Sequence, residues 1–508
     1  MEEPVLELDD IQGSIVPGFK KNSQHFVFFR IVDTTLARGW LRNIASRISS
    51  AREVKEAHTL WKQMRERRGG DPDNLDFLFL SCALSAEALR KLKIEGVDQF
   101  DDAAFKLGLE SRAGVVGDPP AGSGEPGSPD TWLFGAGAKK PDVLIILATD
   151  DYAWAKQSER ELVTSAQLGG LQQIHVDRGR VRPGNMAGHE HFGFRDGISH
   201  PAIRGRISTA PDDFFEPRMW PSDTAFDKFR NRYATPGRQL VWPGHFLFGY
   251  ARQKRDEPTE MRPDSEPTGP LWAKNGSFLV YRRLKQDVPR FQNFIISAVA
   301  SLRTSGFDPN LTPERLGAML VGRWASGWPV MRDAKIDRGS DQAGANYFGF
   351  SEAVTAPLPG DLNPMNPADP NGLICPFFAH IRKIQPRDDG TDIGPMERTF
   401  QKLLLRRGIT FGPEMEEQSE NDRGLLFVAF QSSIVDQFEF LMNDWVNDAN
   451  KPHSTSGIDP IISSARNATV ALSNGTSSHE LTIPGGWVLA TGGEYMFTPS
   501  ISFFRDRL

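Results

Sequence analysis

The stretch His25–Val32, HFVFFRIV, is apolar and rich in β-branched and aromatic residues, and it predicts a buried β-strand. A helical pattern follows from about residue 35 to residue 64. A second strand-like run, LDFLFL, occupies Leu75–Leu80 and leads into a segment that Ser85 can cap as a helix. The chain therefore opens as strand, helix, strand, helix.

A break follows this opening. Residues 113–132, AGVVGDPPAGSGEPGSPDTW, are rich in Gly, Pro, Ser and Asp and predict a long surface loop. After the loop, Asp142–Thr149 (DVLIILAT) predicts a third strand, and Ala153–Leu162 predicts a helix. The pattern leaves any further strand in this half open.

A similar order returns later in the chain without a repeat at the level of single residues. Gly276–Arg283 (GSFLVYRR) predicts a strand and Asp287–Leu302 a helix with an apolar face. Gly424–Gln431 (GLLFVAFQ) predicts another strand, which feeds a helix over Ile434–Trp445, and Gly485–Leu489 can form a terminal strand. The second half thus has the same kinds of elements as the first.

Between the halves, residues 208–270 are irregular and rich in Pro, Asp and Arg, so we place the boundary near residue 235. The predicted fold class is α+β, with two ferredoxin-like halves, 1–235 and 236–508. Each half is expected to hold an antiparallel sheet with helices on one side.

Composition narrows the class of protein. With 508 residues, 39% hydrophobic and 24% charged, the chain is an ordinary globular sequence and not a disordered, collagen-like or coiled-coil one. The 47 glycines and 36 prolines indicate long loops between short elements. The net charge of −6 and the lack of a basic block argue against nucleic acid or an anionic membrane as the main partner.

Cysteine usage and the N-terminus bear on compartment. Cys82 and Cys375 are too few for a disulfide framework, a cysteine-based zinc site or an iron–sulfur cluster. The acidic N-terminus lacks the basic and apolar regions of a signal peptide, so a cytoplasmic location is expected. No apolar run approaches the roughly 20 residues that span a bilayer, which predicts no membrane segment.

The densest polar cluster is GHEHFGFRDGISHP at residues 188–201. One interpretation is a mononuclear non-haem metal site built from His189, His191 and Asp196, because imidazole and carboxylate ligands suit iron, manganese or zinc. Positions 189 and 191 share a face in an extended segment, so both could reach one ion.

Asp196 also has two simpler interpretations. It can act alone as an acid/base group, because Gly193 and Gly197 let the backbone turn sharply and give another molecule close approach. Alternatively, Asp-Gly is a common turn pair, and the aspartate then only bonds its own backbone. The local sequence does not decide between these interpretations.

A second cluster, CPFFAHIRKIQPR, covers Cys375–Arg387. His380 lies between an apolar run and the cations Arg382, Lys383 and Arg387, as a haem site requires: imidazole for iron, an apolar wall for the macrocycle and cations for the propionates. A single histidine can equally be a structural residue, and the Cys-x-x-Cys-His motif of covalent haem attachment is absent.

Two further segments, RRGITFG at 406–412 and GIDPII at 457–462, are uninformative singly. In order with the two clusters above, they resemble the dye-decolorizing peroxidases, haem enzymes marked by a Gly-x-x-Asp-Gly motif. The opening LDDIQGSIVPGF and the stretch RGLLFVAFQ add to this resemblance, which runs from about residue 8 to about residue 465. It is nearest to the long branch of the family that includes fungal-like and cyanobacterial-like members.

The resemblance implies a role for several residues around the haem. His380 would be the axial ligand of the haem iron, Asp459 would accept a hydrogen bond from its other nitrogen, and Arg382 would pair with a propionate. On the opposite, distal side, Asp196 would be the acid/base group and Arg406 the arginine that stabilises charge, with its neighbour Arg407 as the competing choice.

The apolar and backbone contacts of the cofactor are implied in the same way. Leu425 and Phe427 match residues that line the distal pocket, and Gly197 would contact the cofactor. The implied fold is the dimeric α+β barrel type, with one non-covalent haem b per chain held mainly by the C-terminal half.

The implied activity is reduction of hydrogen peroxide coupled to one-electron oxidation of dyes, phenols and other aromatic donors. Because an unperturbed aspartate has a pKa of about 3.9, Asp196 predicts an acidic pH optimum. Dyes too large for a buried haem would need a relay through a surface aromatic residue, for which Trp324, Trp328 and Tyr347 are candidates, although each can equally be a packing residue.

Two other functions stay open beside the peroxidase. One is the non-haem metal enzyme with His189, His191 and Asp196. The other is a non-catalytic haem-binding protein that keeps His380 and makes no use of Asp196. The sequence does not indicate the physiological donor or the oligomeric state.

Overall fold

The computed structural model describes residues 2–70, 76–219, 233–235, 237–253, 263–339, 346–352, 367–415 and 422–508. The first half contributes four antiparallel strands in the order β2-β3-β1-β4. Their apolar sequences alternate between two buried faces, as in HFVFF of β1, where Phe26 pairs with Ile146 of β3. The strands are β1 (Ser23–Ile31), β2 (Phe79–Leu84), β3 (Val143–Thr149) and β4 (Leu171–Arg180).

Six α-helices connect these strands: α1 (Thr34–Ile44), α2 (Ala51–Arg68), α3 (Ala86–Lys91), α4 (Ala103–Leu107), α5 (Leu109–Arg112) and α6 (Tyr152–Leu168). The single helix predicted over residues 35–64 is wrong, because the chain breaks between α1 and α2. Ser50 begins α2 with a capping box in which its side chain and that of Glu53 bond each other's backbone N–H. The helix predicted after Ser85 is confirmed as α3.

The second half repeats the arrangement in the order β16-β10-β13-β12. Its main strands are β10 (Ser277–Gln286), β11 (Leu405–Arg406), β12 (Ile409–Phe411), β13 (Gly424–Gln431) and β16 (Val488–Thr498). Its helices are α8 (Val288–Thr304), α9 (Pro313–Val321), α10 (His380–Ile384), α11 (Met396–Thr399) and α12 (Ile501–Asp506), with two π-helical segments, η10 (Ile434–Glu439) and η11 (Leu441–Val446).

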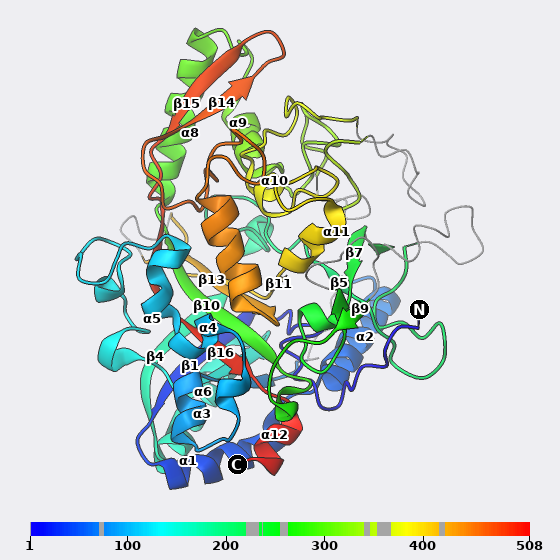
Figure 1. The fold of residues 1–508 in the computed structure, drawn as a ribbon, viewed down its shortest axis with the longest axis vertical. Helices are drawn as coiled ribbons and strands as arrows, with labels where there is room; N and C mark the ends of the chain where they lie inside the picture. The colour runs from blue at the N-terminus through cyan, green and yellow to red at the C-terminus, as the bar shows by residue number, and fades with distance from the viewer. Residues whose placement is uncertain are drawn as a thin grey trace.

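Smaller strands lie outside these two sheets: β5 (Ala202–Ile203), β6 (Tyr233–Ala234), β7 (Arg238–Val241), β8 (Arg252–Gln253), β9 (Pro263–Ser265), β14 (Ala468–Ser473) and β15 (Ser478–Ile483). The strands β14 and β15 form a hairpin that packs against α8. Figure 1 shows this hairpin and α8 projecting together from one end of the molecule.

The two halves join edge to edge into one closed barrel. β16 pairs with β2 at Phe497 and Leu84, and β12 pairs with β4 at Phe411 and Gly179. Because β10 also pairs with β13, the ring of strands has no free edge between the halves. The predicted α+β class with two ferredoxin-like halves is confirmed. The boundary near residue 235 stays a prediction. It lies between β4 and β10, and any position between these two strands would divide the two sheets equally well.

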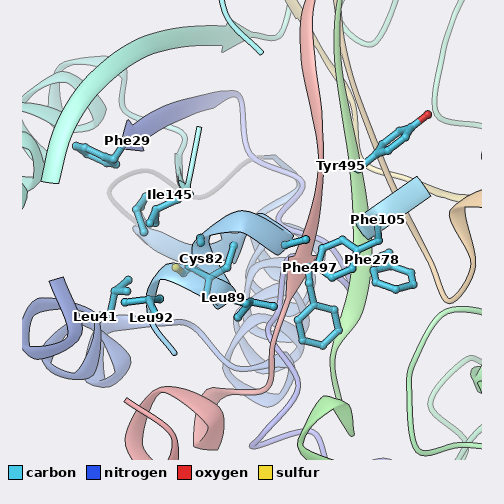
Figure 2. Close-up of a cluster of buried hydrophobic side chains, with 14 of the residues drawn as sticks. Phe29, Leu41, Cys82, Leu89, Leu92, Phe105, Ile145, Phe278, Tyr495 and Phe497 are labelled. Atoms are coloured by element: carbon cyan, nitrogen blue, oxygen red, sulfur yellow. The ribbon is translucent and has the colours of Figure 1, made fainter. Parts of the chain in front are cut away.

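Alternate residues of the strands enter two different cores. Phe26 and Phe28 of β1 belong to a cluster with residues of all parts of the barrel, whereas Val27 and Phe29 belong to a second cluster that packs under the helices of the first half. Figure 2 shows part of this second cluster, in which Cys82 is a buried thiol among apolar side chains.

Several predicted boundaries move. The strand predicted at Leu75–Leu80 is found as β2, which begins four residues later, at Phe79. Residue 75 lies outside the described residues. The terminal strand begins at Val488 and runs to Thr498. β4 was not predicted, because its polar residues His175 and Asp177 break the apolar pattern. Among the described residues, no helix is long and apolar enough to cross a membrane.

Candidate active site

A cavity of about 520 Å³ lies on the helix-covered face of the second half's sheet. The strands β10 and β13, the segment 190–201, the helix α10 and the π-helical segments all contribute to its wall. The polar and charged residues of the wall include Glu190, Asp196, Arg282, Gln286, Arg323, His380, Lys402 and Arg406. A volume of this size is typical of a small-molecule or cofactor site.

His380 begins α10 and presents its imidazole to the cavity. Its Nδ1 lies 2.7 Å from Oδ2 of Asp459, a fully buried carboxylate whose other oxygen accepts hydrogen bonds from the backbone N–H groups of Ile461 and Ile462. Burial opposes ionisation of Asp459, but the charge and hydrogen bond of His380 lower its pKa. The carboxylate therefore fixes Nδ1 as the donor and leaves Nε2 as the nitrogen able to bind a metal.

Asp196 faces the same cavity from the segment that follows η6 (Gly184–Met186). Arg406 Nη1 donates to Asp196 Oδ1 at 2.7 Å, and both side chains keep part of their surface accessible, 23% for Arg406 and 29% for Asp196. Burial opposes ionisation of Asp196, but the charge and hydrogen bond of Arg406 outweigh it and hold the pKa at about 2. The pair is thus an anion and a cation exposed to the cavity.

The structure distinguishes Arg406 from Arg407. Arg406 lies on β11 and lines the cavity, whereas Arg407 turns away and donates from Nε and Nη2 to the carbonyl of Ile15. Successive residues of an extended chain point in opposite directions, which separates these neighbours. Arg406 is therefore the arginine of this pair that faces the cavity.

Leu425 and Phe427 lie on one face of β13 and line the cavity. Gly197 lines it too, with a positive φ of 75°. A Cβ at Gly197 would meet only Nε2 of His200, at 3.6 Å, so this part of the wall is bare backbone beside open space. A flat ring can approach it closely.

The prediction that Arg382 pairs with a propionate is wrong. Its side chain is fully buried, does not line the cavity and directs its guanidinium to Asp369, Asp389 and the carbonyl of Cys375. All five N–H groups have acceptors, so none remains for a ligand. Lys383, also predicted as a cation for the site, is buried among backbone carbonyls, with Nζ 2.9 Å from the oxygen of Asp448.

Arg323 is a buried cation of the cavity wall that the sequence analysis did not select as a site residue. It precedes Trp324 in GRWASGWP, lines the cavity and is 4% exposed. Burial, together with repulsion from Arg387 and Arg406, lowers its pKa to about 9. A concentration of positive charge on the wall of a buried cavity suits an anionic ligand group.

The non-haem metal hypothesis has no support in this geometry. Nε2 of His191 lies 2.9 Å from the carbonyl of Phe411, and neither His189 nor His191 lines the cavity, while Asp196 is paired with Arg406. Within the described ranges, no group of three or more His, Cys, Asp or Glu side chains could hold a metal ion.

The three aromatic residues proposed as a surface relay are not at the surface. Trp324, Trp328 and Tyr347 are 4%, 3% and 6% exposed. Trp324 donates its indole N–H to the carbonyl of Asp333, which is a packing role. The prediction of a surface position for them is wrong.

The residues present fit a haem. One imidazole with a fixed donor nitrogen faces a cavity that has an apolar wall at Leu425 and Phe427, a bare backbone at Gly197 and a buried cation at Arg323. This donor set, a histidine backed by a carboxylate, matches haem ligation better than a structural zinc site, which would need further nitrogen or sulfur ligands.

Comparison with known proteins agrees with this fit. Residues 10–183 match the family described as the DyP dimeric alpha+beta barrel domain. The chain is 31% identical to dye-decolorizing peroxidase msp1 of Mycetinis scorodonius, over 99% of this chain and 88% of that protein. It is also 31% identical to dye-decolorizing peroxidase AauDyP1 of Auricularia auricula-judae, over 99% and 87%.

Solved structures give the same result. The chain superposes on an ancestral D-type dye-decolorizing peroxidase with a TM-score of 0.76 and 31% identity, covering 99% of both chains. A dye-decolorizing peroxidase in complex with 2,6-dimethoxyphenol gives a TM-score of 0.73 and 30% identity, again over 99% of both chains. The chain therefore belongs to the dye-decolorizing peroxidase family and is a peroxidase of that class.

Proposed function

We propose that this chain binds one haem b non-covalently, with His380 as the axial ligand, and uses Asp196 and Arg406 to reduce hydrogen peroxide. The observation that carries the proposal is the placement of two polar pairs, His380–Asp459 and Arg406–Asp196, at one cavity of about 520 Å³. When bound, the haem supplies a redox-active iron. The protein residues supply the ligand, the proton transfer and the charge stabilisation.

His380 and Asp459 act on the ligand side. Because Asp459 is ionised and accepts the Nδ1–H of His380, the imidazole is held in one tautomer and one orientation, and its Nε2 becomes a stronger donor. Arg323, and not Arg382, is the residue that we expect to hold a carboxylate of the haem.

Asp196 and Arg406 act on peroxide. Cleavage of the O–O bond requires a proton to move from the inner oxygen to the outer oxygen of hydrogen peroxide, which then leaves as water. Asp196 can accept that proton at a carboxylate oxygen and return it to the outer oxygen. Arg406 is permanently charged and can donate hydrogen bonds to the oxygen on which negative charge develops.

The electron donors that we propose are dyes, phenols and other aromatic molecules. The similarity to a peroxidase solved with 2,6-dimethoxyphenol supports this class of donor. We also propose an acidic pH optimum. Since the pKa of Asp196 lies at about 2, its proton-accepting form is already present in acidic solution, so this group limits the rate only at the acid end of the profile and permits activity at low pH. A pH–rate profile for donor oxidation that peaks above pH 7 would contradict this part of the proposal.

The absorption spectrum tests the proposal directly. We expect an intense Soret band in the haem-loaded protein and a shift of that band after one equivalent of hydrogen peroxide. Asp196→Asn removes the proton acceptor and Arg406→Leu removes the charge, so each should slow the shift by about 10²–10³-fold.

A matched control is Arg407→Leu, which alters the neighbouring arginine that turns away from the cavity. It should keep the rate of the peroxide reaction within a few fold of the wild-type rate. Survival of full peroxide reactivity in both Asp196→Asn and Arg406→Leu would leave a haem-binding protein without the proposed distal chemistry.

A further inference from the structure

The segment that carries Asp196 forms a short β-hairpin, residues 188–196. The N–H of Asp196 donates to the carbonyl of Gly188 at 2.9 Å, and the N–H of Glu190 donates to the carbonyl of Phe194 at the same distance. An antiparallel bridge between residues 189 and 195 lies between these two bonds. Asp196 therefore lies at the base of the hairpin and Glu190 at the start of its turn, so the shape of the hairpin decides where Asp196 lies.

The side chain of Glu190 holds this turn together. Its Oε1 accepts the N–H of Phe194 at 2.8 Å, and its Oε2 accepts the N–H of Phe192, also at 2.8 Å. Hydrogen bonds from backbone N–H groups to a carboxylate are charge-assisted and stronger than those between neutral groups. Glu190 belongs to the polar cluster at residues 188–201, where the sequence alone indicates no role for it.

Gln286 ties the turn to β10. Its Nε2 donates to Oε2 of Glu190, and its Oε1 accepts the N–H of His191 at 3.4 Å. Both ends of the amide are therefore engaged, which fixes its orientation. Glu190 and Gln286 both line the cavity. The hairpin is thus attached, through the Glu190 carboxylate, to the sheet that forms part of the cavity wall.

Other contacts anchor the hairpin to the second half without the Glu190 carboxylate. The ring centroid of Phe192 lies 4.4 Å from that of Phe291 of α8. The N–H of Arg195 donates to the carbonyl of Ala325 at 3.0 Å. A substitution of Glu190 should therefore change the shape of the hairpin and leave it docked against the second half.

We propose that Glu190 is a positioning residue for the peroxide reaction: its carboxylate holds the hairpin in the shape that places Asp196 beside Arg406. Glu190 does not exchange a proton with peroxide itself, because both of its oxygens already accept N–H donors. The inference rests on the proposed function, in which Asp196 accepts the proton of hydrogen peroxide. It assigns a role to the second carboxylate of the cavity wall near Asp196.

Glu190→Gln tests this role in the haem-loaded enzyme. Its NH₂ group replaces one carboxylate oxygen and must face the N–H of either Phe192 or Phe194. The rate of the spectral shift with hydrogen peroxide should fall by about 10-fold, or about 1.4 kcal/mol, whereas the affinity for haem should stay within about twofold. A loss of haem affinity as large as the loss of rate would indicate a general disturbance of the cavity and overturn the proposal.

Glu159→Gln is the matched control. Glu159 is a buried carboxylate of α6 that pairs with Arg178 and does not line the cavity. This variant should leave both the rate of the spectral shift and the affinity for haem unchanged.

A double variant separates positioning of Asp196 from a merely structural role. If Glu190 acts through Asp196, adding Glu190→Gln to Asp196→Asn should slow the reaction by less than about twofold further. A further 10-fold loss would mean that Glu190 acts independently of Asp196, which would overturn the proposal. An unchanged rate in Glu190→Gln alone would overturn it as well.

Glu190→Asp guards against misfolding of the glutamine variant. It keeps the negative charge but is shorter by one CH₂ group, so its carboxylate cannot reach the N–H groups of both Phe192 and Phe194. The peroxide reaction should again be several fold slower than in the wild type. A wild-type rate in Glu190→Asp would show that only the charge matters and would refute the positioning role.

Hydrogen exchange gives a readout that needs neither haem nor peroxide. In haem-free Glu190→Gln, the amide of Asp196, which is bonded to Gly188 at the far end of the hairpin, should exchange about 10-fold faster than in the wild type. Glu159→Gln should leave this amide unchanged. Unchanged exchange at Asp196 in Glu190→Gln would overturn the inference, whereas a wild-type protein with no spectral response to peroxide would refute the proposed function alone.

Discussion

The two halves of the barrel share one strand order but use the same sheet face differently. In the first half, the outer face of β1 presents Val27, Phe29 and Ile31 to a continuous apolar core. α1 covers that face directly, with Trp40 and Leu41 in the same core. The first half therefore closes its sheet in the ordinary way, by burying an apolar stripe of helix.

In the second half, the equivalent strand changes character along its length. Phe278 and Val280 of β10 join the apolar core, but Arg282, Leu284 and Gln286, which follow on the same face, line the cavity. The alternation of a strand keeps these five residues on one side. The polar residues Arg282 and Gln286 thus lie on the same face as the apolar residues of the core, and this part of the face forms the cavity wall.

The helices that follow these strands differ as well. α8, which follows β10, packs in a separate core with the β14–β15 hairpin and does not line the cavity. Figure 1 shows α8 extending away from the barrel with that hairpin, whereas α1 lies beside the barrel wall. A ferredoxin-like unit can thus become a cofactor site when its first helix leaves the sheet and the hairpin buries the apolar face of that helix.

The largest effect should come from His380→Ala. Removing the imidazole takes away the only side chain that we propose as an iron ligand, so the Soret band of protein purified with haem should be lost. Folding of the first half should not change, because His380 lies on α10, which packs against α9 and η11 of the second half. Far-ultraviolet circular dichroism should therefore match that of the wild type.

His189→Ala is the matched histidine control for this experiment. Its Nδ1 lies 3.2 Å from the carbonyl of Ala187 and the residue does not line the cavity, so haem content should be unchanged. Equal loss of haem in both variants would show that His189 is needed for haem binding as much as His380 is, which would contradict the proposed ligand.

A pair of apolar truncations tests the contrast between the two sheet faces. Phe29→Ala removes a fully buried ring from the core of the first half and should lower the free energy of unfolding by about 3–5 kcal/mol. Leu425→Ala removes a half-buried side chain beside an existing cavity and should cost about 1 kcal/mol. Denaturant unfolding measures both. Equal losses would mean that the two faces are packed alike.

Much of this arrangement is readable from sequence, with limits that have physical causes. The apolar runs of β1, β3, β10 and β13 identify buried strands, since most residues of each of these strands are buried. The same criterion does not identify β4, because polar residues such as His175 and Asp177 take the place of apolar ones in this strand.

The site shows a similar division. His380 and Asp196 are identified by the motifs that surround them, but the partners of a cation depend on distant residues. Arg382 looks like a ligand-binding arginine until Asp369 and Asp389 are seen to enclose it. Arg323 could not be chosen from sequence, because nothing near it in the chain shows that it borders the cavity.

Glu494 lies where the two halves of the barrel meet, and its ionisation gives a further prediction. It is buried on β16, and its Oε1 accepts hydrogen bonds from the N–H groups of Leu109 of α5 and of Tyr495. Burial raises its pKa to about 7, so between pH 4.5 and 7 the folded state holds a proton that the unfolded state releases. This contribution to stability is present below pH 4.5 and is lost as the pH rises to 7.

In Glu494→Gln, the free energy of unfolding should no longer fall between pH 4.5 and 7 because of this residue. Its oxygen can keep both hydrogen bonds while its NH₂ group replaces the protonated oxygen, so at pH 8 the variant should be more stable by about 2–3 kcal/mol. Denaturant unfolding from pH 4 to 8 checks this. A wild-type free energy of unfolding that rises over the same range in parallel with that of the variant would contradict it.

The last prediction concerns the buried partner of His380. In Asp459→Asn, one carboxylate oxygen becomes an NH₂ group, which must face either the Nδ1–H of His380 or the N–H groups of Ile461 and Ile462. The first choice sets the NH₂ group against the N–H of the imidazole, and the second sets it against two backbone N–H groups and displaces the side chain that holds the imidazole. Either choice weakens the fixed orientation of the imidazole. The affinity of the haem-free protein for haem should fall by about 10-fold, or about 1.4 kcal/mol.

Titration of haem into the haem-free protein, followed at the Soret band, measures this affinity. Asp444→Asn is the control, because Asp444 is partly exposed and pairs with Lys451 away from the imidazole. An unchanged affinity in Asp459→Asn would show that His380 is oriented by the packing of α10 and not by the carboxylate. In that case the buried carboxylate of Asp459 would not be needed for haem binding. The two halves would then differ mainly in the position of α8, which leaves the sheet of the second half, whereas α1 covers the sheet of the first.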